Sequence, residues 1–221
     1  MIRTLICDLD NTLFPARTVP RAAVEPALDR VRLANRTGPR ISDARLDEAL
    51  EACWDRAFDE VARLYDLPEA LCHAWEMAAT ELEVTAPLEL YADVDVLWSL
   101  PLRRFLVTTG YRRFQESKIR ALGLASRFEA IYIDALGETH RSGKETLFRQ
   151  ILSEQQADVP ETAVLGDSAE GELLAGERLG LWTIQILREG VVPAPQANSQ
   201  IRSLVELPAV LAQASQARAA T

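Results

Sequence analysis

The sequence predicts an α/β protein with a Rossmann-like, mostly parallel sheet core, helices on both faces of the sheet and an inserted helical region. Three observations predict this class. From about residue 90 onward, short apolar runs of strand length alternate with longer runs of helical pattern, as in proteins built from strand–helix–strand units. A further apolar run at residues 4–9 matches these strands. The block between this run and residue 90 carries mainly helical signals.

The predicted core consists of residues 1–14 and 91–221. Its strands are expected at residues 4–9, 103–108, 130–133, 162–165 and 181–186. Helices are expected between and after them, at residues 111–122, 144–152, 170–179 and 201–212. Residues 190–200 read as a loop. The alternation of strands and helices favours a parallel sheet, because each crossover helix returns the chain to the same end of the sheet.

Residues 15–90 are predicted to form a helical insertion after the first strand. Its clearest signal is an apolar stripe from Leu46 to Tyr65 at spacings of three and four residues, which is typical of an amphipathic helix. Ser42 is the expected N-cap of this helix, after the breaker Gly38-Pro39. Candidates for lining a substrate pocket within the stripe are Trp54, Arg56 and Phe58, and packing in the hydrophobic core is the alternative interpretation.

The composition restricts the kind of protein. Hydrophobic residues make up 48% of the 221 residues, which is enough for a sizeable core. No apolar run approaches the roughly 18 residues that a membrane helix needs, and no signal peptide is apparent, so a cytoplasmic protein without membrane contact is expected. The net charge of −9 disfavours nucleic acid as a partner, because binding it needs cations clustered against phosphates.

The cysteines and histidines suggest no metal centre of their own. Cys7, Cys53 and Cys72 are odd in number and far apart, which argues against zinc and fits reduced cytosolic thiols. Cys7 lies in an apolar strand and is expected to fill the core. His73 and His140 have no partner at metal-ligand spacing, and both are expected to be structural or surface residues.

Polar residues occur where three of the predicted strands end. Asp8 and Asp10 end the first strand, Thr108 and Thr109 end the strand at 103–108, and Asp167 follows the strand at 162–165. Ligands of open parallel sheets bind outside the carboxyl ends of the strands. These side chains are therefore candidates for one binding site.

The spacing of Asp8 and Asp10 indicates a cation. Side chains two residues apart on a strand point to the same face, and two carboxylates so close repel unless a cation or a shared proton relieves them. Mg²⁺ prefers such oxygen ligands together with substrate phosphate, and Asp167 can complete the set. Lys144, at the start of a predicted helix, can neutralise phosphoryl oxygens. The other lysine, Lys118, lies in mid-helix and is expected to be solvated.

Four segments together resemble the motifs of the haloacid dehalogenase-like hydrolase superfamily, in the order in which that family has them. The segments are Asp8-Leu9-Asp10-Asn11-Thr12-Leu13, Leu106-Val107-Thr108-Thr109-Gly110, Lys144, and Gly166-Asp167-Ser168 with Glu172. The resemblance extends from residue 2 to about residue 190. It implies a subfamily I member in which the helical insertion is a C1-type cap.

The resemblance also implies roles for these residues. Asp8 would be the nucleophile that forms an aspartyl-phosphate, and Asp10 would act as general acid and then as general base. The transferring phosphoryl group would be bound by Thr108, Thr109 and Lys144. The implied ligands of Mg²⁺ are Asp8, Asp10 through its main-chain carbonyl, Asp167 and Glu172.

Some positions depart from the family pattern. Glu145 follows Lys144 where proline is usual, Thr109 stands where asparagine is common, and Glu172 stands where aspartate is common. None of these changes removes an essential group.

The expected activity is Mg²⁺-dependent hydrolysis of a small phosphorylated metabolite by a monomer or homodimer. Asp10 favours a phosphate ester over a haloacid, because halide leaves without a proton. The segment Asp-Asn-Thr-Leu-Phe-Pro resembles the nucleotidase-like branch of the phosphatases. The alternatives are a phosphomutase of the same fold, a haloacid dehalogenase and a catalytically silent phosphate-binding protein.

Overall fold

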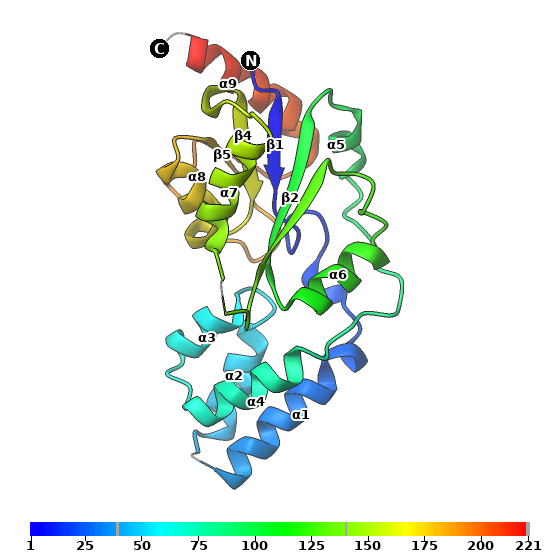
Figure 1. The fold of residues 1–221 in the computed structure, drawn as a ribbon, viewed down its shortest axis with the longest axis vertical. Coiled ribbons are helices and arrows are strands. Elements are labelled where there is room, and N and C mark those ends of the chain that lie inside the picture. The colour runs from blue at the N-terminus through cyan, green and yellow to red at the C-terminus, as the bar shows by residue number, and fades with distance from the viewer. Residues whose placement is uncertain (39, 140, 220–221) are drawn as a thin grey trace.

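The computed structural model describes residues 1–38, 40–139 and 141–219. Its described residues form a parallel sheet of six strands in the order β3-β2-β1-β4-β5-β6 (Figure 1). The strands are β1 Thr4–Cys7, β2 Arg103–Gly110, β3 Ala130–Ala135, β4 Thr162–Gly166, β5 Trp182–Ile186 and β6 Ser199–Ile201. This is the doubly wound order, in which the chain reverses direction across the sheet between β1 and β4. The predicted fold class is confirmed.

The core helices cover both faces of the sheet. They are α5 Asp95–Ser99, α6 Arg112–Ala121, α7 Gly143–Glu154, α8 Leu174–Arg178 and α9 Leu207–Ala219. Leu5 and Cys7 pack into one hydrophobic cluster with residues of α5, α6 and α9. Ile6, which lies between them in the sequence, packs on the opposite face against α7 and α8. The alternation follows from the two-residue period of a strand and confirms that Cys7 fills the core.

Of the described α-helices that follow β1 and precede β2 in the chain, the first four lie beyond the carboxyl ends of the strands (Figure 1). They are α1 Arg21–Thr37, α2 Asp43–Ala52, α3 Phe58–Leu64 and α4 Glu69–Ala79. Ser42 caps α2 as predicted, since its hydroxyl accepts a hydrogen bond from the Arg45 N–H. The stripe at 46–65, predicted as one helix, is divided into α2 and α3. A tertiary hydrogen bond from the Asn11 side chain to the Trp54 carbonyl lies in the break.

Two predictions near the carboxyl end of the chain are wrong. The segment expected to be a loop, residues 190–200, contains the start of β6, which pairs with β5. The helix predicted for residues 201–212 is α9, which begins six residues later, after a short 3₁₀ turn at Leu204–Glu206. A strand of three residues carries too short a pattern to be distinguished from a loop.

Other expectations concern single residues and the membrane. His73 is exposed, as predicted, whereas Pro39 and His140 lie outside the described residues. No helix in the described part of the chain is both long enough and apolar enough to cross a membrane.

Candidate active site

The loop after β1 brings the first two aspartates to the carboxyl edge of the sheet. The Asp8 N–H donates to the Leu165 carbonyl at 2.9 Å, which extends the pairing of β1 with β4 by one residue. The chain then turns tightly at Asn11, whose φ is +54°, a conformation that asparagine tolerates better than most residues. Asp8 is 6% exposed. The strand thus ends by presenting a buried carboxylate beside β4.

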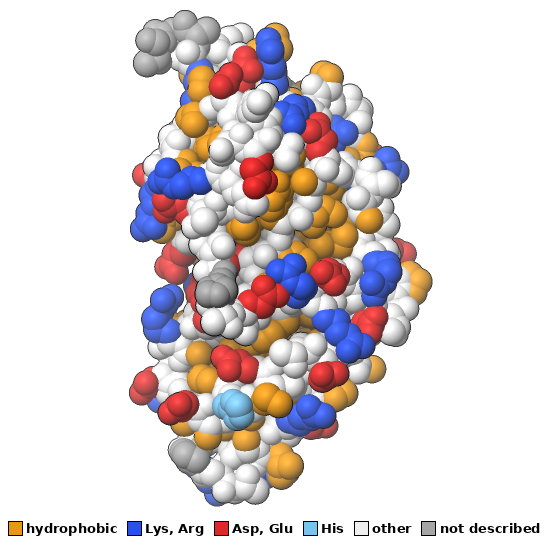
Figure 2. Space-filling view, viewed as in Figure 1, with side chains coloured by type: hydrophobic (Ala, Val, Ile, Leu, Met, Phe, Trp, Pro, Cys, Tyr) orange, Lys and Arg blue, Asp and Glu red, His pale blue; other side chains and the backbone are white. Residues whose placement is uncertain are grey.

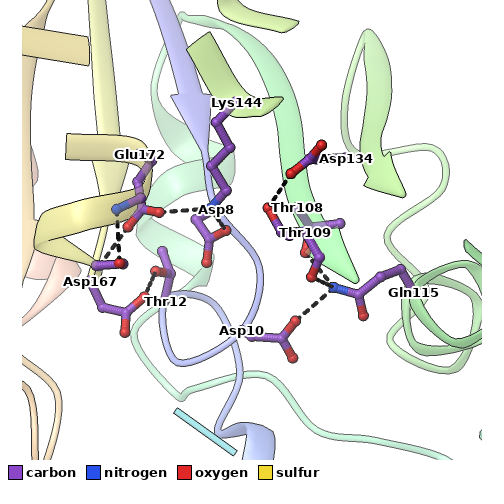
Figure 3. Close-up of polar contacts among 12 residues, drawn as sticks. Asp8, Asp10, Thr12, Thr108, Thr109, Gln115, Asp134, Lys144, Asp167 and Glu172 are labelled. Carbon is purple, nitrogen blue, oxygen red and sulfur yellow. Dashed lines mark hydrogen bonds and ion pairs between the residues drawn. The ribbon is translucent and has the colours of Figure 1, made fainter. Parts of the chain in front are cut away.

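Lys144 joins Asp8 to Glu172 (Figure 3). Its Nζ lies 2.6 Å from Asp8 Oδ1 and 2.7 Å from Glu172 Oε2. The second oxygen of Glu172 accepts the Ser168 N–H at 2.6 Å. A Cβ at Gly166 would lie 2.1 Å from Glu172 Oε1, so glycine at the end of β4 is what allows Glu172 to reach the lysine.

The charges around Lys144 keep it protonated. Burial alone would lower the pKa of the Lys144 ammonium, but the Asp8 and Glu172 carboxylates outweigh burial and raise its pKa above the usual value. Both carboxylates lie within hydrogen-bond distance of the Lys144 ammonium, and such charge-assisted hydrogen bonds are strong. Lys144 therefore supplies a fixed positive charge beside the Asp8 carboxylate.

Three carboxylates converge beside this lysine. Oxygens of Asp8, Asp167 and Glu172 all lie within 4.8 Å of one another, and the Thr12 hydroxyl donates to Asp167 Oδ1 at 3.3 Å. Burial raises the pKa of Asp8 to about 7, against the opposing charge of Lys144. Burial, followed by the charges of Glu172 and Asp8, holds the pKa of Asp167 well above its usual range.

This donor set fits a hard divalent cation. Three carboxylates, of which Asp8 and Glu172 are buried and Asp167 is partly exposed, face a single ammonium. The cluster therefore carries excess negative charge, which a cation would relieve. Carboxylate oxygens are the ligands that Mg²⁺ prefers. The side chain of Asp10 does not join the cluster.

Asp10 instead lies against α6. Lys118 Nζ is 2.5 Å and 2.7 Å from the two Asp10 oxygens, and Gln115 Nε2 donates to Asp10 Oδ2 at 2.9 Å. The prediction of a solvated Lys118 is wrong, because only 6% of its side chain is exposed. The sequence did contain a signal that Lys118 is buried. Residues three or four apart lie on the same face of a helix, and Lys118 shares its face with the buried residues Gln115 and Leu122.

The two threonines at the end of β2 have different surroundings. Gln115 Nε2 also donates to Thr108 Oγ1 at 2.6 Å, beside Asp10. The Thr109 hydroxyl instead donates to Asp134 Oδ2 at 3.3 Å. Successive side chains of a strand point to opposite faces, so the structure places Thr108, but not the Thr109 side chain, in the group around Asp10 (Figure 3).

Asp134 and Arg141 are polar site residues that the sequence analysis missed. Asp134 lies near the end of β3, is 2% exposed, and accepts the Gly143 N–H at 2.9 Å just before Lys144. Arg141 Nη2 pairs with Asp134 at 2.8 Å, and Arg141 Nη1 pairs with Asp59 of α3. The signal for Asp134 was its position directly after a predicted strand, the same signal that identified Asp8 and Asp167.

A cavity of about 410 Å³ joins these groups to the helical insertion. Its lining includes Asp8, Asp10 and Lys144 on the sheet side, with Trp54 and Phe58 on the insertion side. On the face shown in Figure 2, hydrophobic side chains gather at the junction of the two parts, with acidic and basic side chains beside them. The three insertion candidates Trp54, Arg56 and Phe58 all line the cavity, and Phe58 also packs in the core.

Together, the doubly wound sheet and the acid–lysine centre at its carboxyl edge are typical of an α/β enzyme that binds its ligand outside the ends of the strands. The model of the haloacid dehalogenase-like hydrolase family matches residues 2–180, and the chain belongs to this family. The resemblance stated from the motifs is thereby confirmed.

The similarity to individual curated proteins covers less of the chain than the family match does. N-acylneuraminate-9-phosphatase of Mus musculus is 30% identical over 116 residues, which are 50% of this chain and 46% of that protein. The chain therefore matches about half the length of this curated relative.

Two solved structures share the fold over nearly the whole chain. A HAD phosphatase from Thermococcus onnurineus has a TM-score of 0.61 at 18% identity, covering 95% of this chain and 98% of its own. A 2-haloacid dehalogenase from Pseudomonas syringae has a TM-score of 0.55 at 19% identity, covering 96% and 99%. The fold is thus shared by proteins named for two different reactions.

Proposed function

We propose that the protein is a phosphatase that hydrolyses a small phosphate monoester with Mg²⁺ through an aspartyl-phosphate on Asp8. The observation that carries the proposal is the pairing of the buried Asp8 carboxylate with Lys144, with a second aspartate two residues further on. A nucleophilic carboxylate beside a fixed ammonium suits attack on an anionic phosphoryl group. The phosphatase relative and the family membership support the same reaction class.

The proposed metal ligands are Asp8, the main-chain carbonyl of Asp10, Asp167 and Glu172. The three carboxylates in this set lie together, although Glu172 already has Lys144 and the Ser168 N–H as partners. A divalent ion there would neutralise charge on the transferring phosphoryl oxygens.

In the first proposed step, an Asp8 oxygen bonds to phosphorus as the bond from phosphorus to the leaving oxygen breaks. Asp10 gives a proton to that leaving oxygen, and the product alcohol departs. Thr108 and Lys144 hold the phosphoryl oxygens, and Gln115 keeps the Thr108 oxygen in place by donating to it. The hydroxyl hydrogen of Thr108 is then available to the substrate.

In the second proposed step, Asp10 takes a proton from water, and the water oxygen displaces Asp8 from phosphorus. This releases inorganic phosphate and restores the Asp8 carboxylate. We further propose that residues 15–90 act as a cap that excludes bulk water during both steps.

The test is phosphate release from a panel of phosphate monoesters, with and without Mg²⁺, by the wild-type protein and Asp8→Asn. Loss of the nucleophile is expected to lower kcat by roughly three or more orders of magnitude. Asp95→Asn, an exposed aspartate on α5, is the matched control and should retain activity. Equal turnover by Asp8→Asn would remove the proposed nucleophile.

The same panel separates the rival functions once a 2-haloacid, assayed for halide release, and a phosphate-binding measurement are added. A phosphomutase would convert a sugar phosphate without accumulating free phosphate. A dehalogenase would release halide from a 2-haloacid, and a silent phosphate-binding protein would bind phosphate without turning over any ester. The presence of Asp10 as a proton donor argues against a dehalogenase, because a halide leaving group needs no proton.

A further inference from the structure

The cavity between the sheet and the insertion has two chemically different ends. The sheet end contains the charged groups described above. The insertion end is lined mainly by hydrophobic and aromatic side chains, among them Leu28, Leu50, Trp54, Phe58 and Trp75. If the phosphoryl group is held at the charged end, the remainder of the substrate must face this apolar wall.

Trp54 has a fixed position relative to the reacting groups. The Asn11 amide donates to the Trp54 carbonyl at 3.1 Å, and the Asn11 side-chain oxygen accepts the Ala16 N–H at 3.1 Å. Asn11 directly follows Asp10 in the sequence. The loop that carries the proposed acid thus also anchors the backbone of Trp54, whose side chain lines the same cavity as Asp10.

The neighbouring aromatic wall is also rigid. The rings of Phe58 and Trp75 stack with centroids 4.9 Å apart and an interplanar angle of 12°. Both residues are largely buried, with 7% of each exposed. Such a wall provides dispersion contacts and burial for an apolar group. Its Trp75 Nε1–H is a buried donor without a partner among the described residues, so the wall can serve one hydroxyl but not the several of a sugar or polyol.

The charged side chains at the rim of the insertion already have partners among the described residues. Arg141 pairs with Asp59 and Asp134, and Asp55 pairs with Arg17. Arg56 lies 3.9 Å from both Glu60 and Glu170. A polyhydroxylated leaving group would have to displace these pairs or lose its hydrogen bonds to water.

Resting on the proposed phosphatase function, we propose that the leaving group is a compact, ring-bearing apolar alcohol that packs against Trp54 and the Phe58–Trp75 pair. The substrate class is then an arylalkyl or similarly apolar phosphate monoester, in contrast to a sugar or polyol phosphate. Trp54 is the residue that determines this specificity.

The test compares benzyl phosphate with glycerol 3-phosphate and glucose 6-phosphate in the presence of Mg²⁺. All three esters have a primary alcohol as leaving group, so the chemical step is similar and the contact with the cavity wall differs. We expect kcat/KM to be at least about 10-fold higher for benzyl phosphate, from burial of its ring. Trp54→Ala should lower the ratio of kcat/KM for benzyl phosphate to that for glycerol 3-phosphate by about 10-fold.

Two further variants serve as controls. Trp54→Phe keeps an aromatic wall and should retain most of the preference. Leu64→Ala, on the exposed side of α3 at 63% exposure, should leave the ratio unchanged. A wild-type kcat/KM for glycerol 3-phosphate or glucose 6-phosphate equal to or above that for benzyl phosphate would overturn the proposed substrate class and leave the phosphatase function intact. No phosphate release from any ester would overturn both.

Discussion

At the scale of single residues, the main finding is the partner of Asp10. That partner is Lys118, which was expected to be solvated but lies in the candidate site. Its ammonium is also 4.9 Å from the Phe114 ring centroid and 5.6 Å from that of Phe14. Aromatic faces and a carboxylate together stabilise a buried ammonium. Lys118 and Gln115 therefore determine where the Asp10 carboxylate lies, and we regard both as positioning residues.

Lys118→Met should lower kcat with little change in KM. Methionine nearly preserves the length and apolar stem of lysine but leaves Asp10 with only Gln115 as a partner, so the proposed proton transfer loses its alignment. Because general acid–base catalysis contributes about 10²–10⁴-fold, we expect a loss on the order of 10- to 100-fold. Steady-state kinetics with an alkyl phosphate measure this loss.

Arg120→Met is the matched control for this prediction. Arg120 lies on the same helix with 64% of its side chain exposed and pairs with Glu83. Surface ion pairs of this kind contribute about 0–1 kcal/mol, so its kcat and melting temperature should be close to those of the wild type. A Lys118→Met protein that folds and retains wild-type kcat would contradict the positioning role.

At the scale of elements, the ion pair between Arg188 and Asp93 connects four segments of the chain. It pairs with Asp93 through two contacts of 2.8 Å and donates to the Thr12 carbonyl at 3.1 Å. Asp93 in turn accepts the Ser203 hydroxyl and the Leu204 N–H, each at 2.9 Å. The loops after β1, β5 and β6 and the segment before α5 are thereby held in one arrangement.

Asp93→Asn should lower stability in a pH-dependent way. Burial would raise the pKa of Asp93, but hydrogen bonds from Arg188, Leu204 and Ser203 outweigh it and lower the pKa to about 2. The folded state thus favours the carboxylate, so its contribution is complete above about pH 4 and is lost as pH falls through about 2. At pH 7 the substitution should lower the free energy of unfolding by about 2 kcal/mol.

Urea denaturation of both proteins at pH 7 and pH 3 measures this effect. The difference between wild type and Asp93→Asn should shrink at the lower pH, because the wild-type carboxylate then gains less from its partners. The exposed neighbour Asp95, changed to asparagine, should show a small difference at both pH values. A difference for Asp93→Asn that is equal at pH 7 and pH 3 would contradict the ion-pair explanation.

At the scale of the whole molecule, the cluster of three carboxylates lies where the two halves of the sheet meet. Asp8 follows β1, and Asp167 and Glu172 follow β4, the strands between which the chain reverses direction. Their mutual repulsion opposes folding, and a bound cation would remove it. Metal binding and global stability should therefore be linked.

Mg²⁺ should raise the melting temperature of the wild-type protein. A ligand that binds only the folded state at 100 times its Kd stabilises by about 2.7 kcal/mol, which corresponds to on the order of 5–10 °C for a chain of this size. Thermal melts at increasing Mg²⁺ measure the shift without any substrate. Asp167→Asn should abolish most of it.

Glu170→Gln is the matched control for the metal prediction, since the Glu170 side chain is 70% exposed and Glu170 lies three residues from Asp167. It should retain the wild-type shift. An Asp167→Asn protein with the same Mg²⁺-dependent shift as the wild type would place the ion elsewhere.

Much of the fold was predictable from local pattern. The strands at 103–108, 130–133, 162–165 and 181–186 agree with β2 to β5 within a few residues, because the apolar run and the polar residue that ends it are both local features. The strand Ser199–Ile201 and the division between α2 and α3 were missed. Each depends on a contact with a distant segment, β5 in one case and Asn11 in the other.

The amino-acid sequence by itself determined that Asp8, Asp10 and Asp167 follow strands, since a parallel sheet brings the carboxyl ends of its strands to one edge whatever the helices do. Only the tertiary structure decided the partners of those groups. Lys118 and Asp10 are 108 residues apart, and their contact depends on how α6 packs against β2. The apolar wall of the cavity likewise arises from helices whose buried faces look alike in sequence, because burial in a core and exposure to a cavity both select hydrophobic side chains.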